Sequence, residues 1–213
     1  MTMRQKLLMW GAIASAALSL VLLARSRMVR ALVRFSEEPS EVVVPVAGVE
    51  PRACESSFGA PRSEHRTHEG IDIFAKRGTP VVAATDGEVL KVGHDRLGGN
   101  VVSVVGEGLK IYYYAHLDQV RPDLKSGQIV RAGEPLGTVG NTGNARTTPS
   151  HLHFGVYSAT RAFTAVDPAP MLQHNGRTIP YTPPAPPPPA VAPVSSRATH
   201  PAAKRRTHET RLK

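Results

Sequence analysis

The sequence predicts a mostly β protein built on a compact antiparallel domain of two packed sheets. Short apolar runs rich in Val, Ile and Tyr recur from residue 58 onward, bounded by Gly, Asp or Pro, which is typical of strands. No stretch of this region offers ten residues of helical periodicity. We expect this domain to be flanked by an N-terminal apolar helix and a disordered C-terminal tail.

The net charge of +9 belongs to the two ends of the chain. Residues 1–34 carry six Lys/Arg and no acid, residues 177–213 carry seven against one Glu, and residues 42–176 carry thirteen of each sign. Because residues 42–176 carry no net positive charge, they lack the basic surface that binds double-stranded nucleic acid, and we expect no nucleic-acid partner. Cys54 is the only cysteine, which excludes an intrachain disulfide. The fold must therefore be stabilised by its hydrophobic core or by a bound metal.

Residues 7–24 form an uncharged, largely apolar run. As a helix this run would be ~27 Å long, close to the ~30 Å hydrocarbon core of a bilayer. It exceeds the apolar region of a cleavable signal peptide, so we expect residues 1–30 to be an uncleaved membrane anchor, with a cleaved signal as the alternative. Four arginines follow the run and two basic residues precede it, which favours a cytoplasmic location for the domain that follows.

The remaining boundaries follow from changes of composition. Residues 31–55 contain three prolines and read as a linker with one short strand at 42–46. Residues 56–176 form the β domain, with strands expected from residue 71 and at 79–84, 87–93, 100–106, 109–116, 128–130, 135–140 and 151–157. Residues 177–213 are Pro-rich and basic, which predicts a disordered tail, with weak contact to an anionic surface as the alternative reading.

The last of these strands carries two histidines. Side chains alternate across a strand, so His151, His153 and Gly155 share one face while Leu152 and Phe154 share the other. The two imidazoles then point into a common space, as a metal ligand and a catalytic neighbour require. A surface or structural role for the pair is the alternative until partners are found.

Candidate partners lie upstream at His68 and Asp72. The motif differs from helical zinc-protease motifs, because Gly70 interrupts a helix and position 72 is Asp rather than His. We therefore expect a loop that enters a strand, in which Gly70 permits the turn that brings His68 over Asp72.

A third motif is the tyrosine-rich strand that ends at His116. Strand alternation places His116 on the face of Tyr112 and Tyr114, opposite Tyr113 and Ala115. On its own, His116 reads as a histidine at a strand end.

Together, the motifs resemble the M23 family of zinc peptidases, the lysostaphin-type or LytM-domain cell-wall endopeptidases. The similarity covers residues 58–172 and rests on four separated motifs: His68-x-x-x-Asp72, Tyr114-Ala-His116-Leu, Gly140-Asn-Thr-Gly143 and His151-Leu-His153-Phe. The resemblance implies a LytM-type, duplicated-hybrid-motif-like fold. It also implies that His68, Asp72 and His153 bind Zn²⁺, which leaves one coordination position open, and that His116 and His151 are the catalytic pair.

The resemblance implies hydrolysis of peptide cross-links in peptidoglycan, for which we favour a D,D-endopeptidase reaction. A non-hydrolytic LytM-type wall-binding module or activator of another hydrolase is the alternative. A lipoyl-type carrier domain would show similar strands, but Lys91 and Lys125 lack the Met-Lys setting that it needs. A wall substrate places the β domain in the cell envelope, outside the cytoplasmic membrane to which residues 7–24 would anchor it.

Other polar residues near the motifs rank lower. We expect His65 to be solvated and Glu69 to point away from the site, while Asn141, Thr142 and the loop at 147–150 shape the substrate groove. The family often has Glu where this chain has Gly155, which would alter the support of the metal ligands.

Overall fold

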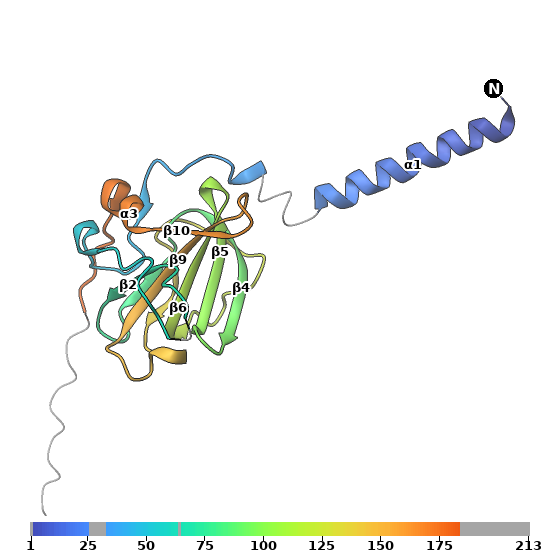
Figure 1. The fold of residues 1–213 in the computed structure, drawn as a ribbon. Helices are drawn as coiled ribbons and strands as arrows, with labels where there is room; N and C mark the ends of the chain where they lie inside the picture. Colours follow the sequence, from blue (N-terminus) through green and yellow to red (C-terminus); the bar gives the residue numbers. More distant parts are fainter. Residues whose placement is uncertain (1, 26–32, 64, 184–213) are drawn as a thin grey trace, which may run out of the picture. The chain divides into compact units, whose positions relative to one another are not determined.

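Strands make up most of the regular structure between residues 42 and 177, which confirms the predicted mostly β class (Figure 1). The computed structural model describes residues 2–25, 33–63 and 65–183. The strands are β1 (Val42–Val43), β2 (Ile71–Phe74), β3 (Pro80–Val82), β4 (Gly87–Asp95), β5 (Gly99–Gly106), β6 (Lys110–Val120), β7 (Ile129–Val130), β8 (Pro135–Val139), β9 (His151–Ser158), β10 (Thr164–Val166) and β11 (Gly176–Arg177). The helices are α1 (Met3–Arg25), α3 (Ala169–Asn175) and three 3₁₀ turns, η1 (Pro51–Ala53), η2 (Glu107–Leu109) and η3 (Gly143–Ala145).

Nine of the strands belong to one antiparallel sheet, with β10, β9, β6, β5, β4 and β7 in that order (Figure 1). Strand β2 pairs with β9, and β8 pairs with both β3 and β6. We expected two packed antiparallel sheets. The hydrogen bonding is instead continuous because β6 is long enough to pair with β9 in its first part and with β8 in its second.

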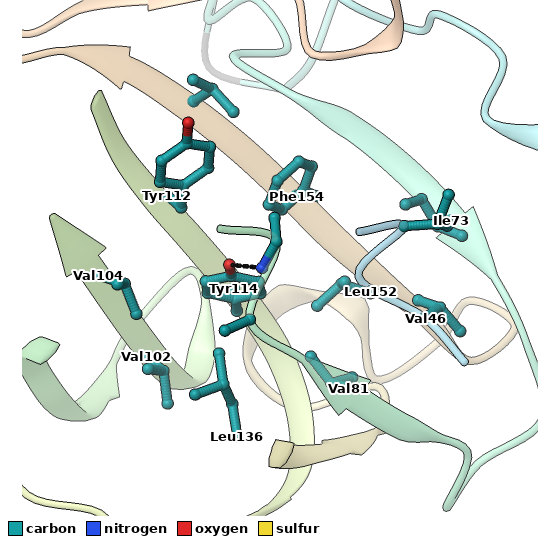
Figure 2. Close-up of a cluster of buried hydrophobic side chains, with 14 of the residues drawn as sticks. Val46, Ile73, Val81, Val102, Val104, Tyr112, Tyr114, Leu136, Leu152 and Phe154 are labelled. Carbon is teal, nitrogen blue, oxygen red and sulfur yellow. Dashed lines mark hydrogen bonds between the residues drawn. The ribbon is translucent and has the colours of Figure 1, made fainter. Parts of the chain in front are cut away.

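The core lies between the strands of the main path of this sheet and the strands β2, β3 and β8 that pair off it. Figure 2 shows side chains of β5, β6 and β9 meeting those of β2, β3 and β8. Tyr112, Tyr114 and Phe154 are its largest fully buried members. The Tyr114 hydroxyl accepts a hydrogen bond from the Ala84 N–H at 2.9 Å, so this buried phenol has a polar partner.

A second, two-stranded sheet pairs β1 with β11 in parallel. The expected linker contains β1, yet its valines at 42, 43, 44 and 46 are fully buried in the core. Val46 forms an antiparallel bridge with Val81 of β3, and Gly48 N–H donates to the carbonyl of Ile179. Backbone hydrogen bonds therefore hold the segments before and after the β domain against it.

The N-terminal apolar run lies in α1. Among the residues that the structure describes, no helix combines the length and apolar character needed to cross a bilayer. The expected membrane anchor at 7–24 is therefore not supported, and the side chains of residue 7 and of residues 20–25 lie outside the described set. The expected disordered tail falls, from residue 184 on, outside the described residues.

Candidate active site

Cross-strand pairing brings two of the predicted motifs onto one face of the sheet. In the antiparallel pair of β2 and β9, Asp72 lies opposite His153 and Phe74 lies opposite His151. The burial of β2 alternates, with Ile71 and Ile73 in the core and Asp72 and Phe74 on the other side. The pairing of β2 with β9, together with strand alternation, thus places His151 and His153 beside Asp72.

Three side chains converge as a candidate metal site. His68 Nε2 lies 2.9 Å from His153 Nδ1 and 3.1 Å from Asp72 Oδ1, and His153 Nδ1 lies 3.3 Å from the same oxygen. Tetrahedral zinc, with bonds of about 2.0–2.2 Å, holds neighbouring ligand atoms roughly 3.3 Å apart. The nitrogen and oxygen donors of these three residues therefore fit zinc in chemistry and spacing.

Neighbouring groups fix the orientation of these side chains. His68 Nδ1 donates to the carbonyl of Ser57 at 2.8 Å, which leaves Nε2 directed at the site. Arg62 Nη2 pairs with Asp72 Oδ2 at 2.6 Å, so Oδ1 is the oxygen that faces the histidines. Burial acts to raise the pKa of Asp72, but hydrogen bonds from His153 and His68 together with Arg62 hold it well below its ordinary value.

Gly70 is required by close packing. A Cβ at this position would lie 2.5 Å from the Phe154 carbonyl oxygen and 2.9 Å from Cε1 of His153. The chain bends at Gly70, where we expected a turn, but the φ angle of Gly70 is not positive, so the bend itself does not require a glycine. Its role is to let the backbone of this segment approach the His153 ring closely.

His116 reaches the site through an irregularity in β6. Strand alternation predicts that its side chain lies with Tyr112 and Tyr114, on the core side. Instead, the pairing with β5 shifts register between Asn100 and Val102, and His116 has a positive φ of 61°. This β-bulge turns its imidazole to the face of Ala115, 5.0 Å between ring centroids from His151.

The two remaining histidines each have a fixed tautomer. His116 Nδ1 donates to the carbonyl of Thr142 and His151 Nδ1 donates to that of Pro149, both at 2.9 Å. Each Nε2 is then unprotonated in the neutral ring. Burial, with the neighbouring charges of His151 and His153, lowers the pKa of His116 to about 4, so the ring is neutral at pH 7.

These side chains lie in an active-site cleft of about 1260 Å³. It is also lined by His65, which is exposed as expected, and by Glu69, which we expected to point away from the site. The loop at 147–150 contributes Thr148 and Pro149, as predicted. Thr142 supports His116 through its carbonyl, while Asn141 does not line the cleft.

Sequence reasoning missed three residues of the site. Arg62 pairs with Asp72 from ten positions upstream, and no local pattern signals such a contact. Phe74 and Tyr113 line the cleft, and their alternation with buried neighbours could have indicated both. A Cβ at Gly155 would lie 3.0 Å from the Glu69 carbonyl oxygen and 3.1 Å from a ring carbon of Tyr157, so Tyr157 packs beside this glycine.

Known proteins resemble this chain in sequence and in fold. The sequence pattern of Peptidase family M23 matches residues 66–168. The structure of the catalytic domain of lysostaphin from Staphylococcus simulans is 31% identical, with a TM-score of 0.50, over 56% of this chain and 90% of that domain. The chain belongs to peptidase family M23.

Two curated relatives have names that denote different endopeptidases. The L-Ala–D-Glu endopeptidase of Bacillus subtilis is 38% identical over 114 residues, which is 51% of this chain and 35% of the relative. The peptidoglycan DD-endopeptidase ShyC of Vibrio cholerae is 38% identical over 109 residues, 48% of this chain and 24% of the relative. The chain thus spans about a third or less of the length of these relatives.

Proposed function

We propose that this M23 chain is a zinc-dependent endopeptidase that hydrolyses peptide cross-links in peptidoglycan. The observation that carries the proposal is the meeting of two sets of side chains in one cleft. His68, Asp72 and His153 present three ligand atoms within 4.8 Å of one another, and His116 and His151 stand beside them, each with its Nδ1 held by a backbone carbonyl.

The ligand set suits a catalytic metal because three protein groups converge among the described residues, and a catalytic zinc keeps its fourth position for water or substrate. Zinc held there by His68, Asp72 and His153 would supply Lewis acidity, polarising the scissile carbonyl and lowering the pKa of water from 15.7 toward ~7. Arg62 and Ser57 keep the ligand atoms turned inward. The protein thereby holds the donors in place before any substrate arrives.

His116 and His151 divide the proton transfers between them. The carbonyls of Thr142 and Pro149 each hold one Nδ1–H, so the opposite ring nitrogen of each histidine can accept a proton. One ring accepts the proton of the attacking water at its Nε2, and that proton then passes to the nitrogen that leaves when the peptide bond breaks, directly or through the other ring. Burial of both rings keeps these exchanges out of bulk water: His116 is 8% exposed and His151 is 5% exposed.

We further propose the D,D cross-link between stem peptides as the bond that is cut. The relative ShyC, a peptidoglycan DD-endopeptidase by name, supports this choice. The names of other relatives denote an L-Ala–D-Glu bond and a glycyl-glycine bond. A wall substrate would place the working enzyme in the cell envelope.

Digestion of purified sacculi tests the proposal. Wild-type protein loaded with zinc should release peptides whose masses and new termini identify a cut at the D,D cross-link, while His153→Ala should release none. Release of products cut elsewhere in the stem would refute the bond assignment. A folded, zinc-loaded wild type that releases nothing would refute hydrolysis and favour the activator alternative.

A further inference from the structure

Phe74 is the most exposed large apolar side chain of the β domain in the described part of the chain. It is 61% exposed, although it follows a metal-ligand candidate by two positions and lies 5.2 Å between ring centroids from His151. Exposing a phenylalanine forgoes a large part of its burial free energy. An exposed aromatic ring beside a catalytic histidine is well placed to contact substrate.

Phe74 also lines a second cleft, of about 770 Å³, whose lining includes three residues of β2 and none of β9. This second cleft lies between β2 and the segment of residues 48–60, and it shares Arg62, Asp72 and Phe74 with the active-site cleft. A ligand that occupies the active-site cleft can therefore continue past Phe74 into the second cleft. The metal ligand Asp72 stands at the junction of the two.

The edge of β2 that faces the second cleft can bind an extended chain. The N–H of Asp72 turns away from β9 and reaches Ser57 Oγ at 3.4 Å, whereas the N–H of Ala75 turns toward Ser150 on the β9 side. By alternation, the N–H and C=O of Phe74 face the second cleft. Among the described residues, neither group has a hydrogen-bond partner on that side.

Charged side chains of both signs line the second cleft. Glu50, Arg52 and Glu55 are exposed, and none of the ion pairs within the described residues involves them. An extended peptide with apolar and charged groups matches these surfaces. Its backbone can hydrogen-bond to the edge of β2, a methyl group can pack on Phe74, and its charged groups can pair with the charged side chains that line the second cleft. Cross-linked stem peptides carry all three.

We propose that the second cleft is a substrate subsite that binds the peptide on one side of the bond cut, with Phe74 as its apolar contact. This proposal rests on the peptidase function proposed above. It assigns the peptide an extended conformation along β2. The peptide on the other side of the bond then lies in the active-site cleft.

Steady-state kinetics on a purified cross-linked dimeric muropeptide test the contact. Phe74→Ala should raise KM about tenfold, the effect of losing roughly 1.4 kcal/mol of binding, with a smaller change in kcat and unchanged zinc content. Phe163→Ala is the matched control, because Phe163 is 55% exposed and lines neither cleft. A KM for Phe74→Ala equal to that of wild type would overturn the subsite.

A binding measurement separates this proposal from the function itself. The same dimer is added to ¹⁵N-labelled, zinc-loaded His116→Ala protein, and amide shifts are mapped. We expect shifts at residues 48–57 and at Phe74, and shifts confined to the active-site cleft would overturn the subsite. Shifts in the second cleft without hydrolysis by wild type would leave the subsite standing and refute the peptidase function.

Discussion

Replacing Gly70 with alanine tests whether close backbone approach holds the metal ligand in place. The added Cβ would lie 2.5 Å from the Phe154 carbonyl oxygen, about 0.9 Å inside the 3.4 Å of ordinary contact, and 2.9 Å from the His153 ring. The ring would have to retreat by about 0.5 Å, more than the ±0.2 Å that a metal site tolerates. We expect zinc affinity to fall about 10- to 100-fold and the free energy of unfolding to fall by about 1–3 kcal/mol.

Two other glycines provide a graded comparison. A Cβ at Gly93 would meet only Lys91 Cε at 3.5 Å, so Gly93→Ala should leave zinc binding unchanged. A Cβ at Gly155 would lie 3.0 Å from the Glu69 carbonyl, which predicts an intermediate loss. Zinc dissociation constants from chelator competition and denaturant unfolding of the metal-free proteins give the two readouts. Wild-type zinc affinity in folded Gly70→Ala would refute this reasoning.

Three further predictions concern the site and the core. His153→Ala should lose bound zinc by metal analysis, whereas His116→Ala should retain zinc and lose turnover by about 10²–10⁴-fold; the reverse pattern would show the roles to be misassigned. Chelation of zinc should lower the melting temperature, since zinc at a hundredfold its dissociation constant adds about 2.7 kcal/mol, and an unchanged melting temperature would argue against a formed site. Tyr114→Phe should cost about 1–3 kcal/mol in denaturant unfolding, because the buried Ala84 N–H loses its acceptor, and an unchanged midpoint would contradict that contact.

Local alternation was enough to predict the two faces of β9. The pattern of His151 and His153 against Leu152 and Phe154 survives in the structure because neither β2 nor β9 is interrupted within the site. The meeting of His68 with His153 needed the resemblance to a family, because the two residues are 85 positions apart and alternation carries no information about which strands pair.

Alternation failed where the backbone departs from a regular strand. The bulge before Leu117 moves His116 from the core face to the site, and nothing in the residues at 114–117 announces it. The role of Gly70 also depends on distant atoms, those of Phe154 and His153, so a turn was the simpler expectation. The single sheet exists because β6 pairs with β9 in its first half and with β8 in its second. The sequence of one strand does not show which other strands it pairs with.

The proposed division between metal ligands and proton-transfer residues is tested most directly by comparing wild type with His116→Ala at equal zinc content. Both proteins are loaded with zinc, the metal is quantified, and peptide release from purified sacculi is measured by mass spectrometry. We predict one zinc per chain in each protein and peptide release by wild type alone. Equal release by the two proteins, or loss of zinc from His116→Ala, would contradict the central claim.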